Sequence, residues 1–125
     1  MNGSRHSALL RIYSSEMDLS VLVSRFGESA KHSRSRSDLK RNGQPWGEAQ
    51  WTRDSQIQSE WLEDLIEDHV SWLEDKLKED PKVMTDCVGD IYCVLEPVDN
   101  QAGVLICREM MPRLAALNLS LLIGI

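Results

Sequence analysis

Three histidines and three cysteines are the side chains of this sequence best suited to bind a metal ion or act as nucleophiles. His6 lies just before a predicted strand, His32 lies in a predicted loop, and His69 lies in a predicted helix. The cysteines form no C-x-x-C pair and lie in segments with strand-like alternation; they are Cys87, Cys93 and Cys107. Zinc sites use short, regular ligand spacings. We therefore expect no metal or other cofactor, and cysteines that pack as small core residues.

The sequence contains no familiar catalytic motif. G-x-S-x-G, a phosphate-cradling glycine loop and H-E-x-x-H are all missing. His69 lies among Leu62, Leu65 and Leu73 in an apolar helical stripe, so we expect a half-buried histidine with one hydrogen-bond partner. Carboxylates of the same helix could form an acid–base pair only if burial raised the pKa of one of them. We predict a protein that is not an enzyme.

The helix predicted over residues 59–80 separates apolar from acidic side chains. Ser59 is the expected N-cap, and Pro81 ends the helix. One half of the helical wheel is largely apolar: Trp61, Leu62, Leu65, Ile66, His69, Val70, Trp72, Leu73 and Leu77. The other half holds carboxylates: Glu60, Glu63, Asp64, Glu67, Asp68, Glu74 and Asp75.

The charge of this helix exceeds what solubility requires. Residues 60–80 hold nine acidic side chains and two lysines, a local charge of −7 in a chain of net charge −6. Neutral i, i+4 pairs would stabilise the helix better. A surface of one sign accelerates association with an oppositely charged partner. We therefore expect the acidic side chains to bind a partner with a basic cleft.

Residues 28–49 form a long polar loop with five basic side chains between residues 31 and 41. Loops of this length in a compact domain are usually functional. The basic groups either fold back on the protein's own acidic helix or reach an acidic patch on the partner. Trp46 follows Pro45 in a turn and is the expected anchor, with Arg34 and Arg36 as further contacts. The acidic remainder of the protein argues against nucleic acid as the ligand.

The 125 residues and 42% hydrophobic content are typical of one globular domain over residues 1–125. No apolar run approaches the roughly 18 residues of a membrane span, and the start lacks a signal-peptide core. The odd number of unpaired cysteines is typical of a reducing compartment. We expect a cytoplasmic protein that does not bind membranes.

Alternation and helical stripes predict the order β-α-β-α-β-β-α-β. The predicted strands are 7–14, 50–57, 82–96, 103–107 and 117–125, with a turn at 97–103, and the helices are 19–26, 59–80 and 108–117. Asp18 and Gly27 should cap the first helix, Gly89 should mark a bulge, and Asn118 should adopt a left-handed conformation. The expected fold is α+β, a mostly antiparallel sheet with helices packed on one face.

Three stretches resemble a bacterial family catalogued as domain of unknown function 4279: LLRIYSSEMDLSVLVSRFG, the basic loop leading to GEAQW, and RLAALNLSLLIGI. The matching positions are Gly27, His32, Gly47, Trp51, Leu114 and Leu117. The chain lacks the family's glycine soon after His32 and has Asn118 where glycine is usual. Members resemble immunity proteins that accompany bacterial polymorphic toxins, and the resemblance transfers no catalytic residues.

The resemblance implies an immunity protein that occludes the active site or substrate-binding cleft of a cognate antibacterial toxin. A toxin acting in the cytoplasm would be a nuclease, an NAD-dependent enzyme such as an ADP-ribosyltransferase, or a toxin directed at translation. Two other functions remain open. A small-molecule-binding or enzymatic domain, with a pocket between sheet and loop, predicts saturable ligand binding without a protein partner. A subunit of a larger housekeeping complex predicts several stable partners.

Overall fold

The computed structural model describes residues 6–95 and 105–124. Its elements, in chain order, are β1 (Ser7–Ser14), α1 (Leu19–Phe26), β2 (Ala49–Asp54), α2 (Leu62–Glu79), β3 (Val88–Val94), α3 (Met110–Ala116) and β4 (Leu119–Gly124). The turn predicted at 97–103 lies outside the described residues.

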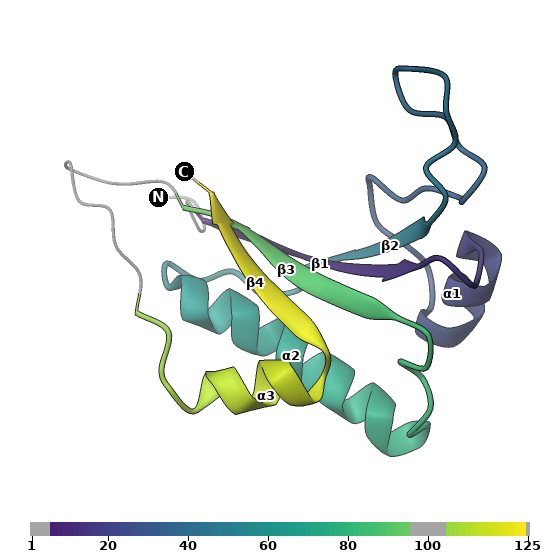
Figure 1. The fold of residues 1–125 in the computed structure, drawn as a ribbon. Coiled ribbons are helices and arrows are strands. Elements are labelled where there is room, and N and C mark those ends of the chain that lie inside the picture. The colour runs from purple at the N-terminus through teal and green to yellow at the C-terminus, as the bar shows by residue number, and fades with distance from the viewer. Residues whose placement is uncertain (1–5, 96–104, 125) are drawn as a thin grey trace.

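The four strands form one sheet in the order β2-β1-β3-β4 (Figure 1). β1 pairs antiparallel with β2 and β3, whereas β3 and β4 run parallel. The predicted α+β fold is confirmed, with a mixed sheet. The strand predicted at 103–107 is wrong over its described part, because residues 105–107 are irregular and lead into α3. The chain therefore reaches β4 through a helical crossover, the connection that parallel neighbours require.

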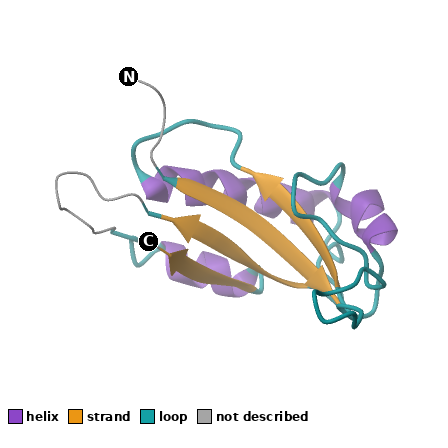
Figure 2. Cartoon of the chain, turned by 90° about the horizontal axis from the view of Figure 1, so that it is seen from above, coloured by secondary structure: helices purple, strands orange, loops and turns teal. Residues whose placement is uncertain are grey.

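Helices α2 and α3 cover one face of the sheet, and within residues 6–95 and 105–124 the other face carries no helix (Figures 1 and 2). Alternation directs Leu10 and Ile12 of β1 into the core, where Ile66 and Val70 of α2 are also fully buried. Trp51 of β2 is also buried. Its ring stacks on that of Trp72 at 5.4 Å and lies 5.3 Å from that of Phe26.

The ends of α1 and α3 follow the local sequence signals. Asp18 accepts a hydrogen bond from the Leu19 amide, and Gly27 has the positive φ of 102° that glycine tolerates best. Asn118 adopts the predicted left-handed conformation, with a φ of 58°. These three positions confirm the predicted caps.

The start of α2 differs from prediction. Helical geometry begins at Leu62, with Trp61 at the N-cap position. The Ser59 hydroxyl accepts a hydrogen bond from the Trp61 amide at 3.0 Å. Because Trp61 is itself the N-cap residue, this bond lies in the loop before the helix and does not cap the helix. This two-residue shift of the helix start leaves Trp61 outside the helix.

The loop between α1 and β2 is folded. Short β-bridges join Arg34 to Gln50 and Leu39 to Pro45, and the Trp46 amide donates to the Asp38 carbonyl at 2.9 Å. The loop rises from the end of the sheet on the side away from α2 and α3 (Figure 1).

β3 is shorter than predicted and contains no bulge at Gly89. Turns occupy residues 81–86, and Gly89 sits in regular register between Ile12 of β1 and Leu119 of β4. A Cβ atom at Gly89 would lie 2.6 Å from the Arg11 carbonyl oxygen and 2.8 Å from a Leu119 methyl carbon. Glycine is therefore required here for the close approach of neighbouring strands.

Candidate partner-binding sites

The tryptophan at the start of α2 is the most exposed one in the chain. Trp61 has 71% of its surface accessible, although the helical pattern predicted it with the apolar half of α2. That prediction is wrong because Trp61 occupies the non-helical N-cap position, with a ψ of 119°, so it does not follow the apolar stripe. An exposed tryptophan is the residue type most enriched in the anchors of protein interfaces.

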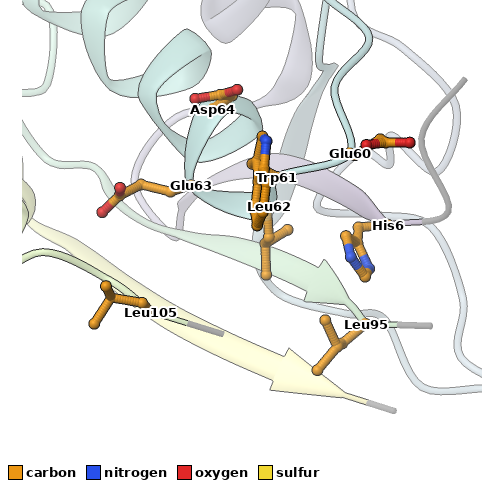
Figure 3. Close-up of a pocket in the computed structure, with 8 residues that line it drawn as sticks. All are labelled: His6, Glu60, Trp61, Leu62, Glu63, Asp64, Leu95 and Leu105. Carbon is orange, nitrogen blue, oxygen red and sulfur yellow. The ribbon is translucent and has the colours of Figure 1, made fainter. Parts of the chain in front are cut away.

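Carboxylates surround Trp61. They belong to a hollow of about 310 Å³ lined by His6, Glu60, Trp61, Leu62, Glu63, Asp64, Leu95 and Leu105 (Figure 3). Glu63 accepts from the Cys107 amide at 2.6 Å, and Asp64 accepts from the Ser59 hydroxyl at 2.6 Å. These bonds hold two of the three acidic groups in fixed positions. We call Glu60, Trp61, Glu63 and Asp64 the Trp61 site.

Cys107 lies beside this site and is not a core residue. It was predicted in a buried strand, but it is exposed in the loop before α3. The Glu63 carboxylate, which accepts from the thiol at 3.5 Å, raises the pKa of Cys107. A raised pKa lowers the thiolate fraction and therefore the nucleophilicity of the thiol.

Further along α2, Glu67 and Glu74 are paired within the molecule. Arg113 of α3 donates to Glu67 Oε1 at 2.6 Å and to Glu74 Oε1 at 2.7 Å. Hydrogen bonds from Arg113 lower the pKa of both carboxyl groups. Asp68 pairs with Arg53 of β2 at 3.1 Å. Three predicted partner contacts therefore already join α2 to α3 and to the sheet.

The remaining predicted carboxylates divide between the two ends of α2. Glu60, Glu63 and Asp64 gather at the Trp61 site, while Asp75 lies near the other end, 3.8 Å from Lys78. The sequence offered one signal for the internal pairing: Arg113 is the single charged residue between positions 110 and 124. Such a residue in an apolar amphipathic segment requires an acidic neighbour.

His69 is fully buried, with more partners than the one predicted. Its Nδ1 lies 2.8 Å from the Arg53 guanidinium, and its Nε2 lies 2.9 Å from the Ala8 carbonyl oxygen and 3.1 Å from the Ser55 hydroxyl. Because a guanidinium only donates, Nδ1 accepts and Nε2 carries the proton. The ring therefore donates to Ala8 and cannot take a proton from Ser55. Desolvation lowers the pKa of His69 to about 4.

In the loop, Trp46 is enclosed by cationic groups. The Arg34 guanidinium lies 3.8 Å from the Trp46 ring centroid and the Lys40 ammonium 5.4 Å from it, which leaves the tryptophan 40% exposed. Arg34 also donates to the Gln50 side chain at 3.0 Å and lies 3.6 Å from Glu48. Trp46 and Arg34 therefore form one ordered unit.

The basic loop does not fold back on α2. Among the described residues, its ion pair is the one between Arg34 and Glu48, and the Arg36 amide donates to Asp18 beside α1. The loop and the Trp61 site lie at opposite ends of the molecule (Figures 1 and 2). The predicted contacts therefore form two separate surfaces.

Alternating aromatic and cationic side chains continue from the loop across the open face of the sheet. Arg11 lies 4.8 Å from the ring centroid of Tyr92 and 5.7 Å from that of Tyr13, and Arg34 lies 5.9 Å from the Tyr13 centroid. Asp90 pairs with Arg11 at 2.7 Å. Arginine and aromatic groups are enriched in protein interfaces, so this face is also suited to a partner.

A second hollow, of about 540 Å³, opens near β3 and β4. It is lined by Tyr13, Val88, Gly89, Asp90, Ala115, Asn118, Leu119 and Ser120, with no residue of the loop 28–48. Over residues 6–95 and 105–124, no group of three or more histidine, cysteine, aspartate or glutamate side chains is placed to hold a metal ion. In the same residues no helix has the length and apolarity of a membrane span.

Comparison with known proteins gives no relative: no protein-family model, no curated protein and no solved structure matches the chain. The resemblance to domain of unknown function 4279 therefore stays a prediction from the sequence.

Proposed function

We propose that this protein is a cytoplasmic immunity protein that binds a cognate antibacterial toxin and occludes its active site or substrate-binding cleft. The observation that supports this most is the Trp61 site, an exposed tryptophan amid three carboxylates. The resemblance noted in the sequence supports the biological setting.

The composition of the site suits a basic cleft. Nucleases and enzymes that use NAD bind phosphates, so their clefts carry cationic groups. Glu60, Glu63 and Asp64 would take the place of phosphates, while Trp61 would supply the apolar contact that excludes water. Binding of this kind blocks the substrate by occupation and needs no reaction on the immunity protein.

Charge reversal at the site tests the proposal on kinetics. The double variant Glu60→Lys, Asp64→Lys should associate with the toxin at least about tenfold more slowly at low salt, with a flatter salt dependence, because steering is lost. The matched control is Glu16→Lys, Glu79→Lys, which changes the net charge equally at two exposed positions outside both the Trp61 site and the loop 28–49. Equal slowing in both double variants would mean that only net charge matters and would contradict the proposed site. Glu67 and Glu74 are unsuitable for this test because their reversal would also break the Arg113 pairs.

The same toxin preparation tests the Trp46 loop as a second contact. Because Trp46 is 40% exposed and held in place beside Arg34, we expect Trp46→Ala to weaken binding by at least about 2 kcal/mol without changing the melting temperature. Co-expression of the toxin with each variant should show growth rescue in the same order as the affinities.

The small-molecule-binding alternative is favoured by one observation, the 540 Å³ hollow with Asp90, Ser120 and Tyr13 at its rim. It predicts saturable binding of a metabolite by the isolated protein. Lack of a toxin partner together with such binding would replace the immunity proposal.

A further inference from the structure

The two edges of the sheet differ in whether other residues of the chain form hydrogen bonds with them. Along β2, loop residues cover the outer edge: the Ala30 amide donates to the Thr52 carbonyl at 2.9 Å, and Arg34 and Gln50 exchange backbone hydrogen bonds of 3.0 and 2.9 Å. Along β4, at the other end of the strand order, no described residue pairs with the outer edge. An uncovered edge is a template for pairing with another strand.

The hydrogen-bonding groups on that free edge can be assigned. The carbonyls of Asn118 and Gly124 accept from Gly89 and Leu95, so they face β3. Because backbone groups alternate along a strand, those of Ser120 and Leu122 also face β3, and those of the odd-numbered residues face outward. The outward set is Leu119, Leu121 and Ile123.

The β4 edge also lacks the features by which proteins protect such strands. Over residues 110–124 the only charged side chain is Arg113, which is held by Glu67 and Glu74 of α2. β4 contains no proline, lysine or bulge. Leu122 and Ile123 of β4 are 49% and 39% exposed, and Met111 of α3 is also exposed.

We propose that β4 pairs antiparallel with β4 of a second copy of this chain and joins two sheets into one of eight strands. A two-fold axis requires a self-complementary surface. The uncharged β4 edge meets this requirement, whereas it offers nothing to a partner recognised by charge. Glu67 and Glu74 of α2 are paired with Arg113 of α3, and the helix α2 itself lies farther from β4 than α3 does, so two acidic copies can approach along this edge (Figure 1).

The register follows from the outward groups. A two-fold axis through Leu121 places Leu121 opposite its own copy and Leu119 opposite Ile123, so that residues with outward amides and carbonyls face each other. On the face that α3 covers, leucine and isoleucine side chains then meet one another, and on the open face Leu122 meets Ser120 of the second copy. The strand is only six residues long, so we expect a dissociation constant on the order of micromolar.

Sedimentation equilibrium of the purified protein, from about 1 µM to several hundred micromolar, tests the dimer. We expect a shift from 14.2 kDa to twice that mass. The variant Leu122→Lys, Ile123→Lys should remain monomeric with unchanged circular dichroism and melting temperature. The matched control is Val21→Lys, Val88→Lys, which adds the same two charges at exposed residues of α1 and β3, and it should dimerise normally.

Hydrogen exchange then locates the interface. The amides of Leu121 and Ile123 should exchange quickly in dilute protein and slowly at high concentration, whereas those of Ser120 and Leu122, which face β3, should be slow in both. A monomer at every concentration, or a dimer in which Leu121 and Ile123 still exchange quickly, would overturn the proposal. Neither measurement uses a toxin, so the outcome is independent of the proposed function.

Discussion

His69 links the buried face of α2 to the sheet and makes stability depend on pH. Its pKa in the folded protein, about 4, lies below the ordinary value of 6.5, so the unfolded chain binds more protons between these values. Stability is therefore fully present above about pH 6.5 and falls by up to about 3 kcal/mol as the pH decreases to 4.

Denaturant unfolding at several pH values measures this slope. In His69→Gln the amide can still donate to the Ala8 carbonyl, but the titrating group is gone, so the slope between pH 6.5 and 4 should flatten. The control variant His32→Asn, at an exposed position, should show the same slope of stability against pH as the wild type. An unchanged slope in His69→Gln would show that another group causes the dependence.

Arg113 should contribute to stability although its side chain is about one-third exposed. Its guanidinium joins α3 to two carboxylates of α2, and we expect Arg113→Met to destabilise the fold by about 1 kcal/mol after solvent screening. The pKa values of Glu67 and Glu74 should rise towards their ordinary range, as an NMR titration would show. Arg108→Met, at a far more exposed arginine, should change neither quantity.

For single residues, the sequence predicts those structural features that depend only on neighbours along the chain. Asp18, Gly27 and Asn118 could be assigned because caps are local. The partners of Glu67 and His69 could not, since Arg113 and Ala8 are 46 and 61 residues away and only the fold brings them near. Trp61 was misplaced because the helix begins two residues later than predicted, which leaves Trp61 outside it at the N-cap position.

At the scale of elements, the close packing of β1, β3 and β4 depends on Gly89. Gly89→Ala would push a Cβ atom against the Arg11 carbonyl and Leu119, and we expect a loss of about 2 kcal/mol or more. Gly124→Ala is the control, since its nearest contact would be 3.5 Å away. Similar melting temperatures for the two variants would show that β1 and β4 can move away from residue 89 without a loss of stability.

Amphipathic patterns predicted α1, α2 and β1, because each has one face in the core and one in solvent. The strand predicted over residues 105–107 is wrong, because a short apolar run there is compatible both with a strand and with the irregular segment that precedes α3. The parallel pairing of β3 with β4 was not predicted, because the extra strand expected at 103–107 stood between them although the helix at 108–117 was expected.

For the whole molecule, the charges and aromatic groups divide between separate regions. The Trp61 site lies at one end of α2, and the Trp46 loop rises at the other end of the sheet (Figure 1). The end of β4 lies near the Trp61 site, because Leu95 lines the hollow there and its amide donates to the Gly124 carbonyl (Figure 3). The Trp61 site and the end of β4 therefore adjoin, and the Trp46 loop is separate from both (Figure 1).

The most direct test of the proposed function is quantitative affinity capture from the native organism, comparing wild type, Trp61→Ala and the control Val21→Ala. Val21 is an exposed apolar residue on α1, away from the site. We expect one stoichiometric partner with a basic cleft, retained by wild type and Val21→Ala and lost with Trp61→Ala. Capture of the same partner by all three proteins, or of none by wild type, would contradict partner binding through the Trp61 site.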